Sequence, residues 1–149
     1  MREALAKLPG EGKVLRAFGD EATVCLSGEE TDGRLTVLAT ATPPGSGPPP
    51  HFHEHDDEWF FPLEGRVEFF LDGGWKEMPA GSVVFVPRGV VHTFRNVGDG
   101  PLKMIVQLAP AGFEIFFEKC AAEFAKPGPP SMEKILAIGA EHGIHFVQE

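Results

Sequence analysis

Short apolar runs separated by glycine and proline recur through most of this chain, and they restrict the folds open to it. The runs are rich in β-branched and aromatic residues, and Asp72-Gly73-Gly74 is the strongest hairpin signal between them. They cover residues 14–18, 23–27, 34–40, 58–63, 67–71, 75–78, 82–86, 92–97 and 102–108. Many short strands with regular turns predict a mostly β protein, built as an antiparallel sandwich or barrel.

The length of the chain suits one domain with a substantial core. It has 149 residues, of which 42% are hydrophobic and 23% charged, as in an ordinary globular protein. The 13 basic and 22 acidic residues give a net charge of −9, so we expect no nucleic acid or anionic membrane as partner. We also find no membrane-span-length apolar run and no signal-peptide pattern. Cys25 and Cys120 are isolated, as expected for reduced thiols of a cytoplasmic protein.

Histidine and carboxylate residues cluster in the middle of the sequence. His51 and His53 are two residues apart, and Glu58 follows five residues later. Residues two apart in an extended segment point to the same side, so both imidazoles can reach one point. The proline-rich residues 43–50 form a stiff segment that presents them from one direction. With His92 as a fourth ligand, the set suits a divalent first-row transition metal better than calcium or magnesium.

The spacing of these residues resembles the two motifs of the cupin family, and every defined position matches. The first motif, G(X)5HXH(X)3–4E(X)6G, is filled by Gly45, His51, His53, Glu58 and Gly65. The second motif, G(X)5PXG(X)2H(X)3N, is filled by Gly81, Pro87, Gly89, His92 and Asn96. The resemblance implies a jelly-roll β-barrel that holds one ion of iron, manganese, nickel, cobalt, copper or zinc. It does not choose among these metals.

The C-terminal part of the sequence changes from strand to helical periodicity. One helical face carries Phe113, Phe116, Phe117, Cys120 and Phe124. A second helix is expected between an N-cap at Ser131 and a C′ glycine at Gly143. We therefore expect a single cupin domain over residues 1–149, with the barrel over about 14–109 and a helical segment over about 110–149. The two helices are expected to cover an end or edge of the barrel, and a lid or dimer contact is the alternative role.

Apolar side chains are expected to line the pocket around the metal site. By strand parity, Phe60 faces the same side as Glu58, and Phe94 faces the same side as His92. Phe60 and Phe94 are therefore candidate substrate-pocket residues. His55 also lies two residues from a proposed ligand, but we expect it to be a solvated turn residue.

The absence of tyrosine narrows the function that the resemblance implies. The chain has 13 phenylalanines and no tyrosine, whereas cupins resembling thiol dioxygenases or sugar-nucleotide epimerases use a tyrosine. The HXH(X)4E spacing resembles the quercetinase-type cupins, which implies that Glu58 is both metal ligand and catalytic proton acceptor. We therefore expect a metal-dependent dioxygenase of a flavonol or other enol-like small molecule. The resemblance to small cupins also implies a homodimer. A metal-dependent isomerase or lyase of a small sugar or keto acid, or a non-catalytic binding protein, stays open.

Overall fold

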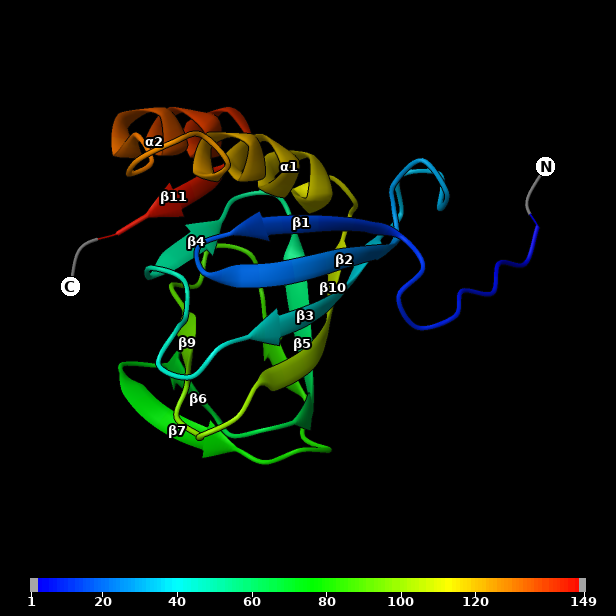
Figure 1. The fold of residues 1–149 in the computed structure, drawn as a ribbon. Helices are drawn as coiled ribbons and strands as arrows, with labels where there is room; N and C mark the ends of the chain where they lie inside the picture. Colours follow the sequence, from blue (N-terminus) through cyan, green and yellow to red (C-terminus); the bar gives the residue numbers. More distant parts are fainter. Residues whose placement is uncertain (1–2, 148–149) are drawn as a thin grey trace.

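The computed structural model describes residues 3–147, and strands make up most of its regular structure (Figure 1). The strands are β1 (Lys13–Ala17), β2 (Asp20–Leu26), β3 (Thr36–Thr42), β4 (His51–His53), β5 (Asp57–Glu64), β6 (Val67–Leu71), β7 (Gly74–Met78), β8 (Val84–Val86), β9 (Thr93–Asn96), β10 (Leu102–Ala109) and β11 (Ile144–Phe146). The helices α1 (Phe113–Phe124) and α2 (Met132–Glu141) lie between β10 and β11. Within residues 3–147, neither helix is long and apolar enough to cross a membrane.

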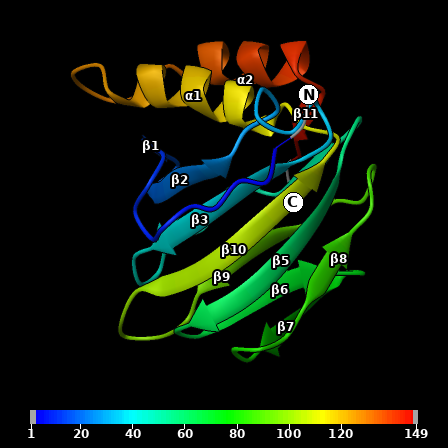
Figure 2. The same cartoon turned by 90° about the vertical axis from the view of Figure 1, so that its right-hand side faces the viewer.

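The strands form a large sheet, a smaller sheet that faces it, and a third sheet of the two strands β11 and β4. The large sheet has the order β1-β2-β3-β10-β5-β8, and the smaller sheet has the order β7-β6-β9. Figure 2 shows the smaller sheet lying behind the large one, and all the paired strands are antiparallel. This arrangement is the predicted jelly-roll β fold followed by two helices.

The main core fills the space between the two sheets. Alternate residues of β3 and β10 are buried, which is the two-residue period expected of strands with one inward face. Val67 and Phe69 of β6 have no exposed surface, and Phe69 packs edge-on against Phe60 of β5 at a centroid distance of 5.0 Å. The motif glycine Gly65 has φ 91°, and a Cβ there would lie 2.5 Å from the carbonyl oxygen of Pro101. A close backbone approach therefore explains why this position takes glycine.

The two helices form a layer over one end of the barrel, as Figure 1 shows. We call α1, α2 and β11 the cap. The predicted apolar face of α1 is the buried one, with Phe116, Phe117 and Cys120 in a second core beside Leu15 of β1. In α2 the hydroxyl of Ser131 accepts a hydrogen bond from the backbone N–H of Lys134 at 3.3 Å, which confirms the predicted N-cap.

The strand β11 was not predicted from the sequence. It has three residues and pairs with β4, where Ile144 lies opposite His53 and Phe146 opposite His51. A strand this short has no periodicity of its own and depends on its long-range partner. The chain therefore returns from the helices to hold the strand that carries two of the predicted metal ligands.

Candidate metal centre

The four side chains predicted as metal ligands meet at the end of the barrel beneath the cap. His51 and His53 lie on β4, Glu58 lies on β5, and His92 directly precedes β9. Their ligand atoms all lie within 4.8 Å of one another, and each residue is at most 9% exposed. His92 joins the group because its backbone exchanges two hydrogen bonds with that of His51, at 2.9 and 3.1 Å. The structure thus brings the whole predicted set together from separate segments.

Each imidazole is oriented by a contact to its Nδ1 atom. The Nδ1 of His51 lies 2.8 Å from the carbonyl oxygen of Pro49, and the Nδ1 of His92 lies 2.9 Å from that of Val90. A carbonyl oxygen only accepts, so in both rings Nδ1 carries a proton and Nε2 is the nitrogen left for a metal. The Nδ1 of His53 lies 3.1 Å from a carboxylate oxygen of Asp56. This arrangement leaves all three Nε2 atoms available to a metal.

The electrostatics of the cluster favour the metal-binding protonation states of His51 and Glu58, but not that of His53. Burial, followed by the charges of His92 and His53, lowers the pKa of His51 to about 3. Burial also acts to raise the pKa of Glu58, but the neighbouring histidines outweigh it and lower that pKa below its usual value. Burial opposes protonation of His53, yet the negative charge of Glu58 and the contact with Asp56 raise its pKa. At neutral pH the cluster therefore holds a neutral His51 and an ionised Glu58.

A buried nitrogen without a partner tests whether a metal fits this site. Within residues 3–147, the Nε2 of His53 has no hydrogen-bond partner. It lies 3.4 Å from Oε1 of Glu58, which itself lies 3.0 Å from Nε2 of His92. An unpaired buried nitrogen is costly, and a cation among these donors would remove that cost. Three imidazole nitrogens and one carboxylate therefore fit a divalent transition metal, whose identity this ligand set does not specify.

An apolar cavity of about 60 Å³ adjoins the cluster and includes His51 and Glu58 in its wall. Phe60 and Phe94, the two pocket residues expected from strand parity, both line it. Most of the remaining wall is also aromatic or aliphatic, which keeps bulk water away from the ligands.

The cap supplies the part of the cavity wall that sequence reasoning missed. Phe113 stacks on His53 at a centroid distance of 5.4 Å and an interplanar angle of 17°, and Phe146 lies 6.0 Å from the ring of His51. Phe116 and Phe117 line the same cavity. The helical stripe in the sequence was the available signal, but periodicity alone does not say which end of a barrel a helix covers.

The turn after β4 separates residues that looked alike in the sequence. The His55 side chain is 70% exposed and lies 3.3 Å from Glu54, so it stands outside the cluster as expected. Asp56, to which the sequence assigned no role, is only 8% exposed and orients His53. Asp57 faces outward and accepts hydrogen bonds from Arg88.

Comparison with known proteins identifies the family. A cupin domain model matches residues 40–108, a range that contains all four of the clustered residues. The chain is a small cupin. Quercetin 2,3-dioxygenase of Bacillus subtilis is 32% identical to it over 108 residues, which are 72% of this chain and 32% of that protein.

Two further relatives carry other descriptions. Polyketide synthase CurC of Streptomyces cyaneus is 36% identical over 67 residues, which are 45% of this chain and 44% of that protein. The chain thus spans less than half the length of both curated relatives. A predicted oxalate decarboxylase from Thermotoga maritima superimposes with a TM-score of 0.66 at 23% identity, covering 71% of this chain and 99% of that one. This last likeness concerns the fold alone.

Proposed function

We propose that this cupin is a metal-dependent dioxygenase of the quercetinase type that acts on a flavonol or another enol-like small molecule. The observation that carries the proposal is the double position of Glu58, which lies in the ligand cluster and also in the wall of the apolar cavity. A carboxylate in that position can accept a proton from a substrate whose oxygen binds next to it. The likeness to quercetin 2,3-dioxygenase of Bacillus subtilis supports the same reaction class.

The four clustered residues divide the work of the site. His51, His53, His92 and Glu58 would hold the ion, which would supply Lewis acidity and, for a redox-active metal, reactivity toward dioxygen. Glu58 would take the enol proton, because its lowered pKa keeps it ionised before substrate arrives. The hydrogen bonds that Nδ1 of each histidine donates would hold the rings in place while this proton moves.

The cavity walls limit the substrate. A space of about 60 Å³ holds only a few water molecules, so a three-ring flavonol would enter only if the cap shifts. A smaller enol-like molecule needs less movement of the surrounding side chains. Phe60 and Phe94 would contact its apolar part and exclude water from the reactive intermediate.

Elemental analysis of the purified protein, followed by oxygen-electrode assays on flavonols and related diketones, tests the proposal. We expect about one redox-active divalent ion per chain and substrate-dependent oxygen uptake. Glu58→Gln should abolish uptake, while His55→Ala, which changes an exposed histidine three residues away in the chain, should leave it intact. Bound metal without oxygen uptake across the panel would contradict the dioxygenase assignment.

A second candidate is a metal-dependent isomerase or lyase. The likeness to polyketide synthase CurC favours it, because that name points to substrates rich in carbonyl and enol oxygens rather than to oxygen chemistry. Turnover of a diketone with zinc bound and without oxygen consumption would support the isomerase or lyase function, and binding without turnover would support a non-catalytic protein.

We also propose that the protein is a cytoplasmic homodimer in which residues 1–149 form one domain. Light scattering would test the dimer, and limited proteolysis would test the single domain.

A further inference from the structure

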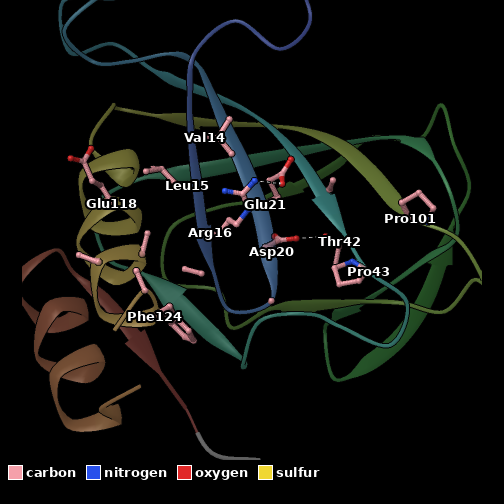
Figure 3. Close-up of a pocket in the computed structure, with 16 residues that line it drawn as sticks. Val14, Leu15, Arg16, Asp20, Glu21, Thr42, Pro43, Pro101, Glu118 and Phe124 are labelled. Carbon is pink, nitrogen blue, oxygen red and sulfur yellow. Dashed lines mark hydrogen bonds and ion pairs between the residues drawn. The ribbon is translucent and has the colours of Figure 1, made fainter. Parts of the chain in front are cut away.

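A second carboxyl group, that of Asp20, lines the same cavity as His51 and Glu58. It begins β2, directly after the turn that joins β1 to β2. Asp20 also lines a larger groove of about 900 Å³, whose wall runs from α1 across the β1–β2 hairpin to Pro43 and Pro101 (Figure 3). Asp20 therefore stands where the inner cavity and the larger groove approach each other.

Strand register explains why this carboxyl group turns inward. Residues Glu21 and Ala41 are paired between β2 and β3, so Asp20 and Thr42 are the next facing pair. The hydroxyl of Thr42 donates a hydrogen bond to Oδ1 of Asp20, a contact drawn as a dashed line in Figure 3. Thr42 is only 1% exposed. Glu21 has the opposite parity and instead accepts a hydrogen bond from Arg16 at 3.0 Å.

The wall of the inner cavity around Asp20 is otherwise poor in polar groups. Apart from His51 and Glu58 of the metal cluster, Thr40 is the other polar side chain among the described residues in the cavity wall. The Thr40 hydroxyl donates a hydrogen bond to the carbonyl oxygen of Met104 at 3.4 Å. Burial raises the pKa of Asp20 to about 6, against the opposing effect of the Thr42 hydrogen bond. The group is therefore mainly ionised above pH 7 and can accept more hydrogen bonds than Thr42 supplies.

We propose that Asp20 is a specificity residue that accepts a hydrogen bond from a hydroxyl group of the substrate. This inference rests on the proposed function, because it presupposes an enol-like ligand at the metal cluster. The substrate would then carry two polar ends: an enol oxygen for the metal side of the cavity and a separate hydroxyl for Asp20. A carboxylate in an apolar wall discriminates strongly, since a ligand without the hydroxyl leaves it with only the Thr42 hydrogen bond.

Two small hydroxypyranones provide the test. Kojic acid and allomaltol share the same enol and carbonyl oxygens and differ by one hydroxyl group. The full chain is loaded with zinc to prevent turnover with oxygen, and each compound is titrated calorimetrically at pH 7.5. We expect kojic acid to bind about 10- to 100-fold more tightly than allomaltol, as for a hydrogen bond to a charged group.

Two variants assign any preference to Asp20. Asp20→Asn keeps the shape and an acceptor for Thr42 but removes the charge, and it should bring the two dissociation constants to within about threefold. Glu21→Gln makes the same chemical change on the outward face of the same strand and should keep the full preference. Zinc content and circular dichroism of both variants should match those of the unchanged protein. A lost preference can then be assigned to the lost charge and not to a disturbed fold or metal site.

Each result bears on the inference separately from the reaction. Equal binding of the two pyranones by the unchanged protein would overturn the inference even if Asp20→Asn fails to fold. A preference that survives in Asp20→Asn would overturn it as well. Absence of binding by either compound would overturn both the inference and the enol-binding site. A preference that depends on Asp20, in a protein that consumes no oxygen with any metal, would support the inference and remove the dioxygenase proposal alone.

Discussion

At the β6 side of the barrel Val67 and Phe69 are fully buried in the core, whereas beneath the cap three histidines and a carboxylate border a cavity. The packed region is closed by the barrel's own strands. The metal-centre region contains polar side chains and a cavity in place of close-packed apolar side chains. Residues outside the barrel strands must therefore shield it from solvent. Phe113 and Phe146 of the cap do so by covering the histidine rings. The difference shows that the barrel positions the ligands, while an added layer makes their surroundings apolar.

Removing ligands should have the largest effect, and only beneath the cap. His51→Ala combined with His92→Ala deletes two of four donors and should lower the metal content from about one ion per chain to background. The β6 side should keep its packing, so the far-ultraviolet circular dichroism should persist. Elemental analysis measures the change, with His55→Ala as the control. Full retention of metal would contradict the assignment of these residues as metal ligands.

Removing one phenylalanine from each region sharpens the comparison. Phe69→Ala and Phe116→Ala should each lower the free energy of unfolding by about 3–5 kcal/mol, because both rings are buried. Only Phe116→Ala opens the cavity wall, so only this variant should release bound metal faster to a chelator. Urea denaturation and stopped-flow metal release give the two readouts. Equal release rates in both variants would mean that the cap does not shield the site.

The orienting carboxylate Asp56 should have a smaller effect on the metal centre. Asp56→Asn weakens the contact that holds the His53 ring, and it should reduce metal affinity about 10- to 100-fold. Asp57→Asn is the matched control, because that neighbour faces outward toward Arg88. Competition with a chelator measures both affinities. A similar loss in the two variants would point to general loosening of the turn instead of a specific role for Asp56.

The smallest effect concerns the pH dependence of stability through Asp20. The pKa of its carboxyl group is raised from 3.8 to about 6 by burial, so folding favours the neutral form. That stability is present below pH 4 and is lost as pH rises through 6. Asp20→Asn should therefore stabilise the metal-free protein at pH 8 by about 1–2 kcal/mol and change little at pH 4. Urea unfolding at the two pH values tests this, and stabilisation at pH 4 alone would reverse the sign.

The sequence predicted the ligand set and most strands because both depend on local spacing. The segment Val67–Leu71 was expected as a strand and is one, and the apolar stripe from Phe113 to Phe124 correctly indicated a helix. The strand Ile144–Phe146 escaped prediction because three residues carry no pattern. The carboxyl groups of Asp20 and Asp56 also escaped it, since nothing in their immediate neighbours distinguishes them from solvated turn residues.

The sequence by itself determined the face on which His51 and His53 lie, because alternation along a strand is a local property of the backbone. Only the tertiary structure decided that the cap covers the metal-centre end of the barrel and that Asp20 enters the cavity. Both outcomes depend on partners distant in the chain: β11 pairs with β4, and Thr42 of β3 donates a hydrogen bond to Asp20 of the neighbouring strand β2. Burial of a side chain is set by such long-range pairing, which no local pattern records.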